Sequence, residues 1–149
     1  MMYALVAFFL IAIKVQGQEE RCSLTPELKK LYQEFHDEWF KRRGRGYVTV
    51  TFNDDMYPLA KDVLNEPGKY ATNNEVYRTT RGSRVLAKRG MSIVQKVDKV
   101  LRGKFILQLV KLGFAHPRKF ACAGKFTEFD ENHQNLTIAC IYARVLNHN

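Results

Sequence analysis

KFACAGKFTEF (residues 119–129) and LTIACIYARVL (residues 136–146) are two largely apolar runs of strand length near the C-terminus. The polar residues 130–135, DENHQN, separate them as a turn, so the pair predicts a β-hairpin. Cys122 and Cys140 lie nine residues either side of Glu131. Residues placed symmetrically about the turn face each other across the hairpin, at a Cβ separation that suits a disulfide. We therefore predict a Cys122–Cys140 bridge.

Upstream of the hairpin the sequence predicts further strands. Residues 105–110, FILQLV, form a short and nearly continuous apolar run, which is typical of a buried strand. Residues 91–101 fit a helical face about as well as a bent strand, but their β-branched residues favour a strand. Residues 70–90 are polar and basic, and we expect a loop there that leads into a strand. The C-terminal part is thus expected to be a meander of strands.

Two helices are expected before these strands. Thr25 is a suitable N-cap and Pro26 occupies the first helical position. The apolar residues that follow have the spacing of one helical face: Leu28, Leu31, Tyr32, Phe35 and Trp39. Residues 47–52 alternate as in a strand, and residues 56–64 predict a second helix. The predicted fold is α+β: an antiparallel sheet of four to five strands wrapped on a helix, with an additional N-terminal amphipathic helix.

The N-terminus predicts secretion. Residues 4–13, ALVAFFLIAI, are ten apolar residues in a row, too few to span a bilayer but the length of a signal-peptide core. We expect a signal peptide at 1–17, an N-terminal helical extension at 18–45 and one domain at 46–149. The expected localisation is extracellular. An oxidising compartment also suits the predicted disulfide.

Three further features concern the mature chain. It loses only Lys14 from the 24 basic residues and keeps all 15 acidic ones, so its net charge falls from +9 to +8. Cys22 is left without an intramolecular partner, free or bonded to another chain as a disulfide-linked dimer. Asn135 begins the sequon Asn135-Leu136-Thr137 and is a predicted glycosylation site.

The residues favour a binding protein over an enzyme. We find no pairing of nucleophile and base, no metal-ligand spacing and no phosphate-binding glycine loop, so no enzyme activity, metal or cofactor is predicted. His36 is expected on the solvated side of the first helix. A basic stretch could bind a polyanion or an anionic surface, with nucleic acid not expected for a secreted chain; its residues are Arg78, Arg81, Arg84, Lys88 and Arg89.

Several segments also resemble the cystatin superfamily. PLAKDVLNEPGKYATNNEVYR is similar to the family's helix and the stretch that leaves it, and RVLAKRG to the strand that follows. KVLRGKFILQLVKLG is similar to the segment around the family's Q-x-V-x-G loop. The C-terminal hairpin is similar to its second disulfide loop. The family's Pro-Trp pair and its first disulfide have no counterpart here.

The resemblance implies reversible inhibition of papain-like cysteine peptidases, by a wedge of one glycine-containing segment and two hairpin loops. The implied peptidase-binding residues are Gly46, Val100, Leu101, Arg102, Gly103 and His133. Of the first-loop pattern only Val100 and Gly103 are kept. The alternative is a non-inhibitory basic secreted protein that binds a polyanion, an anionic membrane or a small ligand. The opening helix also resembles that of the nuclear-transport-factor-like fold, whose pocket would suit a small ligand.

Overall fold

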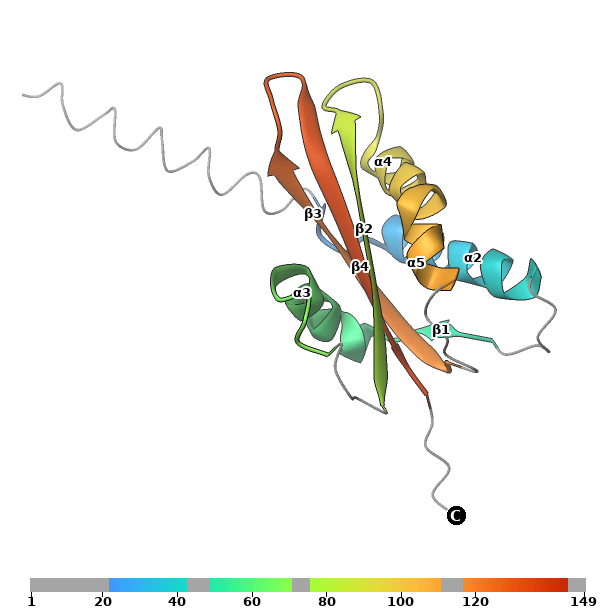
Figure 1. Ribbon diagram of the computed structural model, residues 1–149. Helices are drawn as coiled ribbons and strands as arrows, with labels where there is room; N and C mark the ends of the chain where they lie inside the picture. Colours follow the sequence, from blue (N-terminus) through green and yellow to red (C-terminus); the bar gives the residue numbers. More distant parts are fainter. Residues whose placement is uncertain (1–21, 43–48, 71–75, 111–116, 145–149) are drawn as a thin grey trace, which may run out of the picture.

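The computed structural model describes residues 22–42, 49–70, 76–110 and 117–144. The predicted signal peptide at 1–17 and the implied contact residue Gly46 lie outside this part of the chain. The elements follow the order helix, short strand, helix, long strand, helical segment and C-terminal hairpin. Figure 1 shows them arranged as one sheet with helices on both faces.

The first helix, α2, spans Pro26–Arg42 and confirms the expectation for this region. Thr25 caps it by accepting a hydrogen bond from the amide of Leu28 at 3.2 Å, and Pro26 needs no amide partner in the first turn. Leu28, Tyr32 and Phe35 are buried as predicted, and so is His36. The second predicted helix is also present: α3 spans Tyr57–Asn65, after a short 3-10 turn, η2, at Asp54–Met56.

The sheet has four strands: β1 (Thr51–Phe52), β2 (Tyr77–Ala87), β3 (Lys119–Glu128) and β4 (His133–Ala143). Their order is β1-β3-β4-β2. β3 and β4 form the predicted antiparallel hairpin, in which Cys122 faces Cys140 and is bonded to it. The prediction of a wholly antiparallel sheet is wrong, because β1 runs parallel to β3. A chain crossover of this kind leaves no local sequence signal.

The segment predicted as two further strands is helical. α4 spans Ile93–Val100, the turn η3 spans Leu101–Phe105, and α5 spans Ile106–Val110. Ser92 and Gln95 form a reciprocal capping box at the start of α4, which satisfies two amides of the first turn. This local signal and the burial of Val97 and Val100 on one face outweigh the β propensity of the branched residues. The strand predictions for 91–101 and 105–110 are therefore wrong.

Residues 77–87 form a strand where a loop was mainly expected. β2 pairs with β4 over its whole length without a break in register, from Tyr77↔Ala143 to Ala87↔His133. The sequence of β2 is polar because most of its side chains are exposed; only Thr80, Gly82 and Leu86 are buried. The strand conformation of such a polar sequence depends on pairing with the neighbouring strand rather than on its own apolar residues. β1 is shorter than predicted: residues 49 and 50 are not part of it.

The helices divide between the two faces of the sheet (Figure 1), with α3 on one face and α2, α4 and α5 on the other. The largest side chains of the core meet on the second face, among them Tyr32, Phe105, Phe120 and Tyr142. η3 packs directly on β2, where a Cβ atom on Gly82 would come within 3.0 Å of the Phe105 Cα atom. No helix in the described ranges is both long and apolar enough to cross a membrane.

Candidate functional site

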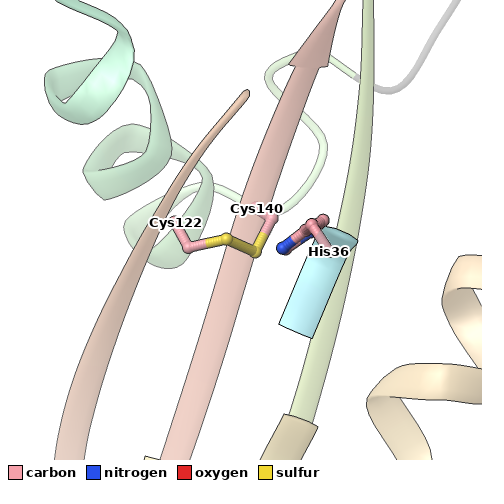
Figure 2. Close-up of side chains that lie close together, drawn as sticks. All are labelled: His36, Cys122 and Cys140. Carbon is pink, nitrogen blue, oxygen red and sulfur yellow. A yellow bond between two sulfur atoms is a disulfide. The ribbon is translucent and has the colours of Figure 1, made fainter. Parts of the chain in front are cut away.

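Three residues with potential metal-ligand atoms lie together in the core, where α2 crosses β3 and β4. Figure 2 shows His36 next to the Cys122–Cys140 disulfide, and the ligand atoms of these three residues lie within 4.8 Å of one another. His36 Nδ1 lies 2.6 Å from the carbonyl oxygen of Tyr32, and Nε2 lies 2.7 Å from the hydroxyl of Tyr142. Both ring nitrogens are therefore already engaged.

This cluster is structural rather than metal-binding. A metal binds cysteine as the thiolate, and both sulfurs are joined to each other. Nδ1 can only donate to a carbonyl, so Nε2 is the unprotonated nitrogen and accepts from Tyr142. Burial lowers the pKa of His36 to about 4, which keeps the ring neutral at ordinary pH. The expectation that His36 is solvated is wrong, since its side chain is fully buried.

The described surface carries a groove of about 490 Å³ along the outer edge of β2. Three segments that are distant in sequence meet there: β2 itself, the end of α3 with the residues after it, and the η3–α5 segment. We call it the basic edge groove; its lining residues are Val63, Pro67, Thr79, Thr80, Arg81, Gly82, Ser83, Lys104 and Gln108.

The backbone of β2 has one side open in this groove. Among the described strands β2 is an edge strand that pairs with β4 alone, and the amide of Lys88 continues this pairing with a 2.9 Å hydrogen bond to the carbonyl of Asn132. In an antiparallel pair the bonded positions alternate. The even-numbered residues of β2 therefore bond to β4, and the odd-numbered ones direct their amides and carbonyls to the outer edge.

The disulfide supports the same alternation. Cys140 is paired with Thr80 on one side and with Cys122 on the other. The Cα atoms of the two cysteines are 4.1 Å apart, close to the separation of a non-hydrogen-bonded pair. The backbone groups of Cys140 must then point toward Thr80, which is an even-numbered residue.

The cations in the basic edge groove have no carboxylate partner among the described residues. Arg81 and Lys104 line it, and none of its lining residues is acidic. Arg84 adds a third cation on the other face of β2, where its Nη1 atom would lie 4.0 Å from a Cβ atom on Gly103. Within the described ranges, no carboxylate lies within 4.0 Å of the charged nitrogens of these three side chains.

Several other cations of the described surface are paired with a nearby carboxylate. Arg102 contacts Asp98 at 3.0 Å and Glu38 at 3.3 Å, and the hydrogen bonds that it donates to these two carboxylates raise its pKa. The cations of the basic edge groove differ in this respect from these paired ones.

The predicted polyanion-binding residues lie on or next to β2, but they do not form one stripe. Arg78 and Arg84 are even-numbered and share one face of the strand, whereas Arg81 is on the opposite face. Lys88 contacts Glu128 at 2.6 Å, and Arg89 is exposed just beyond the strand. Sequence reasoning missed Lys104 and Gln108, because it placed Gln108 in a strand of the sheet and Lys104 in the break before that strand.

Apart from Gly46, which lies outside the described residues, the implied peptidase-binding residues are not brought together as a wedge. Val100 and Leu101 are 1% and 0% exposed, so neither can contact a partner. Arg102 forms the two ion pairs described above, and Gly103 lies in the η3 turn. The expectation of a hairpin loop at residues 99–103 is therefore wrong. His133 is exposed at the start of β4, where its Nδ1 contacts Asp130 at 2.9 Å.

The structure gives the location of the two residues for which a modification is predicted, Asn135 and Cys22. Asn135 lies within β4 and is half-buried, not in the turn as expected, because the strand begins at His133. Cys22 is buried, and burial raises the pKa of its thiol to about 11. An intermolecular disulfide would require the segment around Cys22 to leave its place on the sheet. Glycosylation of Asn135 and dimerisation through Cys22 stay predictions.

A second groove, of about 570 Å³, lies between the N-terminal ends of α2 and α4. Leu31, Ile93 and Val94 contribute apolar surface there, and Lys30 pairs with Glu34 at 3.7 Å. Its charges are mixed and partly paired, so it lacks the concentration of one sign found in the basic edge groove.

The comparisons with known proteins bear on the fold. No family model matches the sequence, and no curated protein matches it. The structure is similar to that of Ancylostoma-secreted protein Ac-ASP-7, with a TM-score of 0.57 and 15% identity, over 89% of this chain and 77% of that one. A structure of manganese-bound Ac-ASP-7 gives a TM-score of 0.59 and 14% identity, over 87% and 76%. At such low identity the likeness shows the fold alone.

Proposed function

We propose that this chain is a secreted, non-enzymatic binding protein that takes an anionic partner into the basic edge groove. The observation that carries the proposal is the meeting of Arg81 and Lys104 in a groove without an acidic lining residue. These two cations come from segments 23 positions apart in the printed sequence. Cations without a counter-charge repel one another, so their proximity adds nothing to the stability of the free protein.

The groove suits an anion in chemistry as well as in charge. Arginine presents a planar fork of donors to carboxylate, sulfate or phosphate oxygens, and Lys104 adds a point charge beside it. Thr79, Ser83 and Gln108 also line the groove, and their side chains can donate hydrogen bonds. A net charge of +9 for the whole chain further favours encounter with an anionic partner.

Secretion is part of this proposal. The apolar run at residues 4–13 supports it, and the structural neighbour is described as a secreted protein. We do not extend that neighbour's bound manganese to this chain, because the one group of three potential ligands found in the described ranges contains the disulfide. Peptidase inhibition has less support, since the residues implied as its first loop are partly buried and helical.

The proposal is tested by measuring binding of two labelled anionic probes, an octaglutamate and a heparin octasaccharide. The double variant Arg81→Glu/Lys104→Glu should weaken binding of at least one probe more than tenfold at 50 mM salt. Wild-type binding should also weaken on raising the salt to 300 mM, because screening shortens the range of charge interactions.

A matched control separates the groove from net charge. Arg118→Glu/Lys99→Glu makes the same change in charge at two exposed positions outside the groove, one just before β3 and one in α4. This control should reduce binding less than threefold. Equal loss in both double variants, or no binding of either probe by the wild type, would contradict the proposal.

A further inference from the structure

We infer that the partner is an acidic polypeptide segment that joins the sheet as a fifth strand along the free edge of β2. This inference rests on the proposed function and names the class of partner. That the partner is a polypeptide follows from the backbone of the basic edge groove rather than from its charge.

The outer edge of β2 offers a regular row of backbone groups. The odd-numbered residues Thr79, Arg81, Ser83 and Val85 face outward, as derived from the hydrogen bond of Lys88. No backbone hydrogen bond to these outward groups is found among the described residues. Each outward residue presents one amide and one carbonyl, and the next follows about 7 Å along the strand. An extended polypeptide backbone matches this alternation of donors and acceptors, whereas a polysaccharide chain does not.

Two features that commonly protect an edge strand are not found in β2. Its sequence, YRTTRGSRVLA, contains no proline, and its pairing with β4 continues without a bulge. Both features commonly block the addition of another strand. The charged side chains of β2 are all arginines, at positions 78, 81 and 84. Charged side chains on an edge strand discourage its pairing with further strands.

The arginines of β2 favour an acidic strand over a second copy of β2. In an antiparallel pairing of β2 with β2 of a second copy, arginines would lie close to arginines, and like charges across strands are destabilising. An acidic strand would instead gain a favourable pair at Arg81 and at Arg84. Since Arg81 and Arg84 project from opposite faces of β2, acidic residues on either face of the added strand find a cation.

The test uses the acetylated peptide (Glu-Thr)₄ and two versions of it, one N-methylated at its four glutamates and one at its four threonines. N-methylation removes the amide hydrogen without changing the charge, and each version blocks one edge of the extended peptide. We expect the parent peptide to bind the wild-type protein and the control variant Arg118→Glu/Lys99→Glu. Its affinity for the groove variant Arg81→Glu/Lys104→Glu should be more than tenfold lower. One methylated version should bind within threefold of the parent and the other more than tenfold weaker.

A protein variant gives an independent check. Val85→Pro removes an outward amide without removing a backbone bond to β4, and Val85 does not line the basic edge groove. It should therefore weaken peptide binding at least fivefold while heparin octasaccharide binding stays within twofold. Its far-ultraviolet circular dichroism and melting temperature show whether the sheet is intact, and the methylated peptides test the inference if it is not.

The outcomes separate the inference from the function on which it rests. If all three peptides bind equally and Arg81→Glu/Lys104→Glu still abolishes binding, the groove binds anions but strand addition is wrong. The same conclusion follows if only the heparin octasaccharide binds and depends on Arg81 and Lys104. If no probe binds, or if the groove variant behaves as its control, the proposed function fails and the inference fails with it.

Discussion

The buried imidazole of His36 should make the stability of the protein depend on pH in a predictable direction. The pKa of His36 is lowered from 6.5 to about 4 by burial, so the unfolded chain takes up this proton first as the pH falls. The contribution of the neutral ring to the free energy of unfolding is fully present above pH 6.5. It is lost as the pH falls from 6.5 to about 4. The slope is about 1.4 kcal/mol per pH unit, which gives a loss of about 3 kcal/mol across this window.

The assay is urea denaturation at half-unit steps of pH from 7.5 to 4, for the wild type and for His36→Gln. Glutamine keeps a donor for the Tyr32 carbonyl and an acceptor for the Tyr142 hydroxyl, but it does not titrate. The wild type should lose about 3 kcal/mol more than the variant over this range, and the variant should be the less stable protein at pH 7. Parallel loss of stability in the two proteins would refute the assignment of His36 as a buried neutral group.

Three further predictions concern stability and are read from urea denaturation at pH 7. Replacing both Cys122 and Cys140 with alanine should lower the free energy of unfolding by about 3 kcal/mol, from the entropy of closing the chain between residues 18 apart; a loss below 1 kcal/mol would contradict this. Gly82→Ala should cost about 1–3 kcal/mol, because its Cβ atom would meet the backbone of Phe105 at 3.0 Å, whereas Gly68→Ala, with nothing within 4 Å, should change stability by less than about 0.5 kcal/mol. Ser92→Ala should cost about 1 kcal/mol by removing the cap of α4, and an unchanged midpoint would show that the capping box contributes nothing.

The elements that the sequence predicts well are those with strong local signals. Thr25 and Pro26 mark the start of α2, and a polar turn between two apolar runs marks the hairpin. The symmetry of Cys122 and Cys140 about that turn is enough to predict their disulfide, because register in a hairpin is set by its turn.

The errors in predicted secondary structure arise where the intrinsic preference of the residues differs from the conformation that capping or strand pairing stabilises. Residues 93–110 are rich in β-branched and large apolar residues, yet Ser92 and Gln95 start a helix there. That capping pattern is visible in the sequence and is the signal that could have corrected the prediction. The polar sequence of β2 gives no comparable signal, since its strand conformation depends on pairing with β4.

The candidate site could be predicted only in part. The basic character of residues 78–89 is evident from the sequence, but the groove requires Lys104 to meet Arg81, which depends on the helical course of η3 and α5. His36 was misplaced for a related reason. Its partner Tyr142 is 106 residues away, and no periodicity within α2 reveals a hydrogen bond of that range.

The most direct test of the central claim is a nuclear magnetic resonance titration of ¹⁵N-labelled protein with the acidic peptide (Glu-Thr)₄. If the basic edge groove takes the anionic partner, the largest shifts should fall on the amides of Thr79, Arg81 and Ser83, with smaller ones on Lys104 and Gln108. Shifts spread evenly over exposed basic residues, or centred on the groove between α2 and α4, would contradict it.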